Sequence, residues 1–175
     1  ALTFTVPKTG SSGLLTVIGP GGTSNIIDLI LVSAPALASF NKSVAVGESV
    51  TLSGTNLAYV SSLTVDGVAA PITAQSSTTI AFTVPDLAPS GTVTVTNAAG
   101  SATSTSVLLV VGPPVVTKFS PASGKVGASV TITGIRLDTV SSVTFGGTSA
   151  TLSKKTATGI TVKVPVGVAK GLVNL

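Results

Sequence analysis

The sequence predicts an all-β fold in which a small antiparallel β-sandwich of about 80 residues occurs in tandem. Three observations lead to this prediction. The same short blocks of sequence return in one register along the 175 residues. Within each block, apolar and polar residues alternate with period two, as in a strand with one buried face. Glycine, proline, asparagine or aspartate interrupts the chain about every 8–12 residues, which is the spacing of a sandwich rather than of strands alternating with helices.

The first repeated block is a strand that ends in proline. It occupies residues 2–7, 80–85 and 160–165, and a glycine follows each proline at the same distance. The first copy reads Leu2-Thr3-Phe4-Thr5-Val6-Pro7, and the three glycines are Gly13, Gly91 and Gly171. Because proline donates no hydrogen bond to a sheet, we expect each strand to end there.

Two further blocks keep the same register. Residues 46–54 return as residues 126–134, and residues 61–67 return as residues 141–147. The first of these blocks alternates valine or leucine with threonine and serine, so one face of its strand is expected in the core. The second ends in a pair of residues that favour a tight turn, Asp66-Gly67 in one copy and Gly146-Gly147 in the other.

These blocks resemble the IPT/TIG family of immunoglobulin-like domains, and the resemblance covers the whole chain. It is carried by residues 119–127, 130–134, 142–147 and 160–165. The earlier copy departs from the family pattern at Phe40-Asn41-Lys42-Ser43 and at Val65-Asp66-Gly67. The resemblance implies tandem immunoglobulin-like β-sandwiches. Since the family occurs in bacterial surface proteins, receptor ectodomains and some transcription factors, it implies no single function.

The phase of the repeats divides the chain into three parts. Residues 1–33 are expected to be the C-terminal strands of an incomplete Ig-like repeat, and residues 34–112 a complete IPT/TIG domain. Residues 113–175 are expected to be an IPT/TIG domain that lacks its last strand, the counterpart of a segment within residues 18–32. A sandwich without this strand has an apolar groove and an unpaired edge, which natural proteins cover or pair.

Two explanations account for the incomplete repeats. In the first, which we favour, the chain is a window on a longer tandem array. In the second, a strand near the N-terminus completes the C-terminal repeat of another subunit and builds a filament. Residues 1–17 and 159–175 occupy the same repeat phase, and this overlap favours the first explanation. The candidate intersubunit or interdomain strand consists of Asn25, Ile26, Ile27, Asp28, Leu29, Ile30, Leu31 and Val32.

The composition argues against an enzyme. The chain has no histidine, cysteine, methionine or tryptophan, and only 8% of its residues are charged. It therefore lacks the imidazole base, the thiolate nucleophile and the usual zinc ligands. Its carboxylates do not recur at equivalent repeat positions or form acid–base pairs; they are Asp28, Glu48, Asp66, Asp86 and Asp138. We expect no catalytic residue, no cofactor and no metal site.

The basic residues are unevenly distributed. Residues 113–175 hold seven basic residues and one acid, a net charge of +6, whereas residues 34–112 hold one lysine and three acids, a net charge of −2. Opposite charges favour contact between unlike repeats, or attraction of an acidic polysaccharide.

Membrane insertion and nucleic-acid binding are not expected. The longest uncharged stretch, residues 87–117, is too rich in polar residues, glycine and proline for a membrane span. The chain has one arginine, and its one tyrosine, Tyr59, is the aromatic residue that we expect at the surface, so it is poorly equipped to read or stack on nucleic acid. The five phenylalanines fall at apolar strand positions and are expected in the core.

The sequence therefore predicts a structural, non-catalytic segment of an extracellular tandem Ig-like array on a bacterial cell surface. Such a segment would form part of a fibre, stalk or adhesin, or a filament subunit assembled by strand complementation. Proline in the Gly112-Pro113-Pro114 linker is expected to stiffen the joint between repeats. The alternative is a spacer or binding module of a surface glycan-binding protein, with Tyr59 as a stacking face. The expected partners are neighbouring Ig-like repeats, other copies of the chain or surface glycans.

Overall fold

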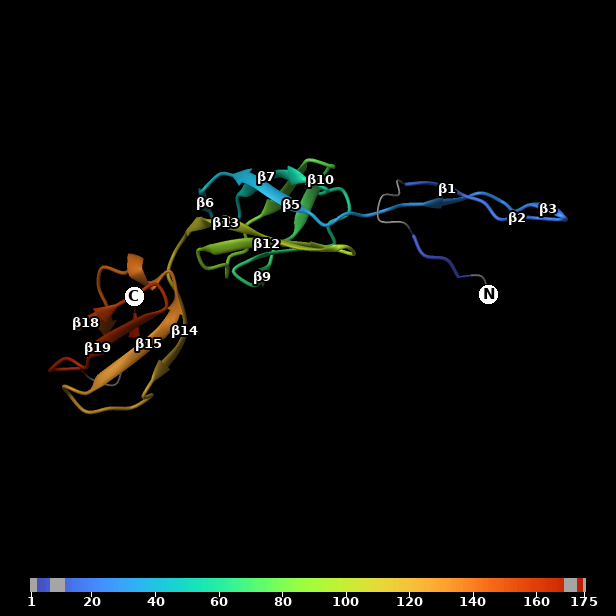
Figure 1. The fold of residues 1–175 in the computed structure, drawn as a ribbon. Coiled ribbons are helices and arrows are strands. Elements are labelled where there is room, and N and C mark those ends of the chain that lie inside the picture. The colour runs from blue at the N-terminus through green and yellow to red at the C-terminus, as the bar shows by residue number, and fades with distance from the viewer. Residues whose placement is uncertain (1–2, 7–11, 169–172, 175) are drawn as a thin grey trace.

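A computed structural model describes residues 3–6, 12–168 and 173–174 of the chain. These residues form β-strands and one short 3-10 helix, η1 (Leu137–Thr139). The strands make three parts that follow one another along the molecule (Figure 1): an N-terminal hairpin, a first sandwich and a second sandwich. The all-β fold and its tandem repeats are as the sequence predicted.

The N-terminal hairpin is a narrow ribbon of two strand pairs. β1 (Gly13–Leu15) pairs with β4 (Ile27–Leu29), and β2 (Ile18–Gly19) pairs with β3 (Gly22–Thr23). Pro20 and Gly21 form the two-residue turn between β2 and β3. This turn lies where the glycine-rich sequence allows the chain to reverse.

The first sandwich consists of a four-stranded and a five-stranded sheet. In sheet order, the four strands are β10 (Ile72–Gln75), β11 (Thr79–Thr83), β7 (Ser49–Thr55) and β5 (Ala36–Phe40). The five strands are β6 (Ser43–Ala45), β13 (Gly100–Val111), β12 (Gly91–Asn97), β8 (Ser62–Val65) and β9 (Val68–Ala69). Neighbouring strands are antiparallel except β6 and β13, which are parallel.

The second sandwich repeats this arrangement, with fewer strands among its described residues. Its four-stranded sheet has the order β14 (Val115–Ser120), β15 (Ser129–Ile135), β19 (Gly159–Lys163) and β18 (Thr151–Lys155). Its other sheet has the order β17 (Thr148–Ser149), β16 (Thr144–Phe145) and β20 (Val173–Asn174). The pairing of Ser129 with Lys163 repeats that of Ser49 with Thr83, so the sequence repeat is also a repeat of strand register.

Alternating side chains from the facing sheets fill two separate cores. Leu52, Ile80 and Phe82 are fully buried in the first core, and Ile160 and Val162 in the second. The two predicted turn pairs have the positive φ angles of a two-residue hairpin, with φ between 47° and 87° at all four residues. The pattern of apolar residues therefore identified core strands of each sandwich, and the Asp-Gly and Gly-Gly pairs identified its turns.

The prediction that all five phenylalanines are in the core was wrong for two of them. Phe119 is 46% exposed and Phe4 is 56% exposed. Phe40, the counterpart of Phe119, packs against the first core. Phe4 lies outside both sandwiches, and Phe119 lies in a repeat whose described residues include no counterpart of β13.

Candidate functional site

The most clearly defined site is the joint between the two sandwiches, which is centred on Arg136. This residue follows β15 with φ of 56°, in the left-handed region. Its side chain is buried, with 5% of its surface exposed. Nε donates to the Pro113 carbonyl oxygen at 2.9 Å, Nη1 to that of Ala88 at 2.7 Å and Nη2 to that of Asp86 at 2.8 Å. One guanidinium group thus connects the second sandwich to the linker and to the first sandwich.

Only arginine has a planar head that donates in several directions at once, and this suits it to the joint. Its acceptors are backbone carbonyl oxygens, and two of them belong to the loop between β11 and β12. That loop is itself fixed, because the Ala88 amide donates to the Pro85 carbonyl oxygen at 3.0 Å and Val110 N donates to Ser90 Oγ at 3.0 Å. The arginine therefore contacts a positioned surface rather than a loose loop.

The linker passes close to both sandwiches at Gly112. A Cβ atom added there would lie 3.0 Å from both Cγ atoms of Val46 and 3.3 Å from Nε of Arg136. These distances are tighter than ordinary van der Waals contacts. The absence of a side chain at Gly112 lets the guanidinium group approach the first sandwich.

Asn56 occupies the same position in the first repeat. It follows β7 with φ of 58°, and its Nδ2 donates to the Ala34 carbonyl oxygen at 2.9 Å. Ala34 precedes β5 as Pro113 precedes β14, so the bond from Asn56 corresponds to the Arg136–Pro113 bond. Asn97 adds a second bond at this earlier joint, from Nδ2 to the Ser33 carbonyl oxygen at 2.8 Å. A side chain in the left-handed position thus contacts the preceding linker in both repeats.

The segment proposed from the sequence as an intersubunit strand lies in the N-terminal hairpin. Residues 25–32 include β4, whose pairing of Leu29 with Gly13 repeats that of Leu108 with Gly91 in the first sandwich. Leu108 is fully buried, whereas Leu29 is half-buried in the hairpin. Ile26, Ile27 and Ile30 are more than half exposed. The hairpin therefore has the sequence and register of a sandwich edge without a sandwich around it among the described residues.

Among the residues that the structure describes, the second sandwich has no counterpart of β13, which closes the first. Within the described residues, β20 is the last strand of its sheet and pairs with β16 alone. Val126 is 50% exposed, whereas its counterpart Val46 packs against the first core and donates its amide to the Val111 carbonyl oxygen at 2.9 Å. Phe119 and Val126 are both exposed, whereas their counterparts Phe40 and Val46 pack against the first core, and we call these two exposed positions together with β20 the open edge.

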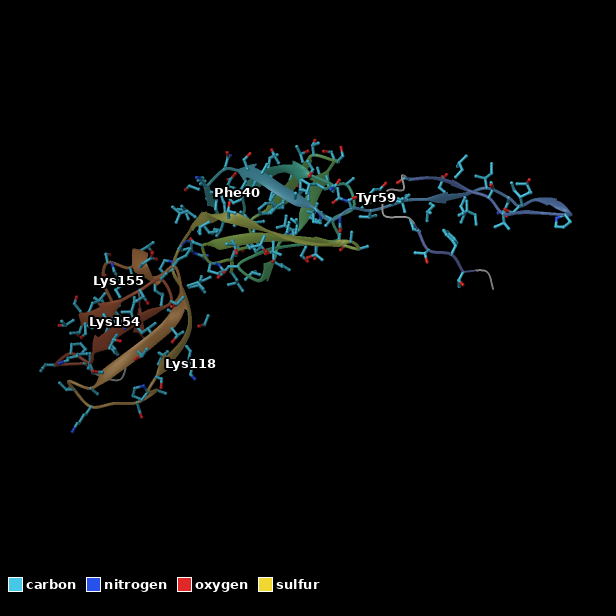
Figure 2. The ribbon with its side chains drawn as sticks, in the orientation of Figure 1. Phe40, Tyr59, Lys118, Lys154 and Lys155 are labelled. Carbon is cyan, nitrogen blue, oxygen red and sulfur yellow. The ribbon has the colours of Figure 1, made fainter. Side chains whose placement is uncertain are left out.

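Tyr59 lies at the end of the first sandwich that faces the hairpin (Figure 2). Its side chain is 52% exposed and lines a shallow hollow of about 140 Å³. The other lining residues are Leu31, Val32, Ser33, Asn56, Ala58 and Ser77. The hollow offers one aromatic face for a ligand.

Potential metal ligands do not cluster in the part of the chain that the structure describes. In the described part of the chain, no three carboxylate, histidine or cysteine side chains come together in a way that could hold a metal ion. Among residues 3–6, 12–168 and 173–174, no helix is long and apolar enough to cross a membrane.

Comparison with known proteins gives a family match and distant structural similarity. The model of the IPT/TIG domain matches residues 35–111 and again residues 114–175. No curated protein sequence matches the chain. A protein crystallised with a xylogluco-oligosaccharide is 19% identical, with a TM-score of 0.46, over 81% of this chain and 38% of that protein.

Two surface glycan-binding proteins are similar at the same distant level. PbSGBP-B from Prevotella bryantii is 17% identical, with a TM-score of 0.40, over 90% of this chain and 37% of that protein. SGBP-B of the mixed-linkage glucan utilization locus of Bacteroides ovatus, in complex with a heptasaccharide, is 20% identical, with a TM-score of 0.37, over 89% and 43%. The chain thus spans less than half the length of each of these three proteins. Because the family model matches most of the residues, in two consecutive segments, the chain belongs to the IPT/TIG family of immunoglobulin-like domains.

Proposed function

We propose that the chain is a structural, non-catalytic segment of an extracellular tandem Ig-like array on a bacterial cell surface. Its role is to hold successive repeats at a fixed angle in a fibre, stalk or adhesin. The observation that carries this proposal is the buried Arg136, which bonds to carbonyl oxygens of both the linker and the first sandwich.

A fixed joint needs more than a short linker. Domains in one chain move relative to each other unless their interface restrains them. Hydrogen bonds that involve a charged donor each contribute about 1.5–3 kcal/mol, and three of them converge on one side chain here. Pro113 and Pro114 also restrict the backbone of the linker. The joint therefore has the restraints that a mechanical spacer requires.

We expect the two sandwiches to keep one relative orientation in solution. Because the chain has no cysteine, Thr51→Cys and Thr131→Cys place two spin labels at equivalent, exposed strand positions of the two repeats. Pulsed electron paramagnetic resonance should give one narrow distance distribution. The control pair, Thr51→Cys with Ser62→Cys, lies within the first sandwich and gives the width of a rigid body. A distribution several times broader than this control would overturn the proposal.

For the second explanation of the incomplete repeats, a filament subunit, we propose that the hairpin and the open edge are complementary parts of one sandwich. In the first repeat, β13 pairs with β12 and buries Leu108 and Val110. β4 corresponds to β13 in register, and β20 corresponds to β12 because both pair with the strand before the tight turn. β4 of one unit is therefore expected to pair with β20 of the next in place of β1, because β1 occupies the edge of β4 that corresponds to the β12-facing edge of β13.

This arrangement predicts head-to-tail association of the 175-residue chain. Leu29→Ser with Leu31→Ser should weaken the association at least about a hundredfold, because each buried leucine contributes about 1.5–3 kcal/mol. Ile30→Ser is the matched control, since its counterpart Leu109 lies on the outer face and is 53% exposed. Sedimentation velocity over a range of concentrations measures the association. A chain that remains monomeric throughout, or equal weakening by Ile30→Ser, would contradict strand completion without affecting the rigid joint.

A further inference from the structure

The four-stranded sheet of the second sandwich carries three lysines on its outer face. Lys118 of β14 is opposite Thr133, Lys154 of β18 is opposite Thr161, and Lys163 of β19 is opposite Ser129. The neighbouring residues Val130, Ile132, Ile160 and Val162 point into the core, so these partners point outwards. Figure 2 shows Lys118 and Lys154 in the second sandwich, on the two edge strands of this sheet. We call this surface the lysine face.

Two of the three lysines are close enough for their fields to add, and the third lies farther along the same surface. With strands about 4.8 Å apart and a rise of about 3.4 Å per residue, the Cα atoms of Lys154 and Lys163 are about 8 Å apart. On the same spacing, Lys118 is about 16 Å from each of them. The screening length at physiological salt is about 8 Å, so the fields of Lys154 and Lys163 add, whereas Lys118 provides a separate charge farther along the same surface. The one carboxylate of residues 113–175, that of Asp138, lies in η1 beside the joint and not on this sheet.

The first repeat provides an internal comparison for these three positions. The same register places Ser39 opposite Ser53, Ala74 opposite Ala81 and Thr83 opposite Ser49. The counterparts of the three lysines are thus serine, alanine and threonine, on a sheet of the same topology. The fold therefore forms with neutral residues at these positions, and packing alone does not require the lysines.

Hydroxyl groups fill the spaces between the lysines. Ser120, Ser129, Thr131, Thr133 and Thr151 are exposed residues of the same four strands. Lysine is a point charge that attracts carboxylate or sulfate groups, and serine and threonine both donate to and accept from sugar hydroxyls. The face carries no aromatic side chain for stacking on bases, and the one arginine of the chain is buried in the joint. These features fit an acidic sugar chain better than a nucleic acid.

We propose that the lysine face binds a linear anionic polysaccharide, and that the second repeat thereby attaches the array to an acidic matrix. Carboxylate or sulfate groups along the polymer pair with the three lysines, and the polymer hydroxyls bond to the serine and threonine residues between them. The binding depends on ionic strength because all three ion pairs are exposed to solvent. The surface is separate from the joint, so it functions whether or not the joint is rigid.

The test uses the 175-residue chain and polygalacturonate, a linear polymer of uronic acid, with heparin as the sulfated probe. Isothermal titration calorimetry at low salt should detect binding that is lost at high salt. The variant Lys118→Ser/Lys154→Ala/Lys163→Thr carries the residues of the first repeat at the three positions. We expect it to bind at least about tenfold more weakly, because each exposed ion pair contributes modestly and three are removed.

The matched control removes the same charge elsewhere. Lys42→Ala/Lys125→Ala/Lys155→Gln changes three lysines that are not on the lysine face. Gln75, the counterpart of Lys155, donates to the Ala58 carbonyl oxygen at 2.8 Å, as Lys155 donates to that of Val140 at 3.0 Å, so glutamine fits there. The control should bind almost as the unmodified chain does. Equal loss in both variants would show an effect of net charge alone and would overturn the assignment.

A variant that gains binding in the first repeat provides a further test. Ser39→Lys/Ala74→Lys/Thr83→Lys places the same three charges on the first repeat and should raise the number of binding sites per chain from about one to two. Circular dichroism confirms that each variant is folded. Preference for galacturonate or for heparin identifies the anionic group. Equal affinity for double-stranded DNA, equal affinity for uncharged dextran, or unchanged affinity of the lysine-face variant would each contradict the proposal.

Discussion

Replacing Arg136 with asparagine is expected to release the two sandwiches from their fixed orientation while leaving both folded. Asparagine occupies the equivalent left-handed position in the first repeat, where Asn56 has φ of 58°. The shorter side chain keeps the bond to the linker carbonyl, as Asn56 does with Ala34, but cannot reach Asp86 and Ala88. The variant therefore removes the bonds between the sandwiches and little else.

The free energy that this substitution is expected to remove from the contact between the sandwiches is large for a single joint. Two hydrogen bonds from a charged donor contribute about 1.5–3 kcal/mol each, and the carbonyl oxygens that they leave are then free to bind water. The spin-label distance distribution between positions 51 and 131 should broaden severalfold. Arg136→Lys should give an intermediate width, because lysine retains the charge but not the planar set of donors. If Arg136→Asn kept the narrow distribution, the linker prolines rather than the arginine would fix the joint.

The regular part of the fold was predictable because it follows from local pattern. Period-two alternation identifies the strands that carry Val50 and Leu52, and it does so again 80 residues later at Val130 and Ile132. The turn pairs Asp66-Gly67 and Gly146-Gly147 were equally readable, because few other residues adopt positive φ at both positions. In each case the residues that determine the structure are neighbours in the sequence.

The joint was not predictable in this way. In the sequence, Arg136 is only one of the seven basic residues of residues 113–175, whereas its acceptors Asp86 and Ala88 are about 50 residues away in sequence. The sequence does carry one signal, which is the position of Arg136 in the repeat. Arg136 aligns with Asn56, and asparagine after a strand favours the left-handed region of φ. That signal indicates an unusual backbone but not burial. Burial depends on how two sandwiches meet, and no periodicity within one strand carries that information.

The lysine face could not be predicted from the sequence for a different reason. Strand register shifts between Val116 and Lys118, and again between Leu152 and Lys154. Beyond each irregularity, the residues that would have pointed inwards point outwards. Simple alternation counted from the start of the strand therefore places Lys118 and Lys154 on the inner face, which is wrong. The net charge of the repeat could be counted from the sequence, but its placement on one face required the register.

Gly134→Ala is expected to destabilise the second sandwich by about 3 kcal/mol. Gly134 lies in β15 at the irregularity of β14, where an added Cβ atom would overlap the carbonyl oxygen of Val115 and approach Cα of Val116 to 3.1 Å. The obstacle is backbone that leads directly from the linker, so it cannot rotate away as a side chain would. Overpacking of this kind costs about 1–3 kcal/mol, and the upper end applies where the neighbours cannot move. Gly54 occupies the same position against Ala36 in the first repeat.

Urea unfolding can assign this loss to one sandwich, because the single tyrosine, Tyr59, belongs to the first. Gly134→Ala should lower the midpoint of the far-ultraviolet circular dichroism transition for the second sandwich and leave the tyrosine fluorescence transition nearly unchanged. Gly159→Ala is the matched control in the adjacent strand, where an added Cβ atom would make ordinary contacts at 3.7 Å. Alanine there should change stability by less than about 1 kcal/mol. Equal losses in the two variants would mean that β14 can move away from β15, and the close approach at Gly134 would then not be a constraint on the fold.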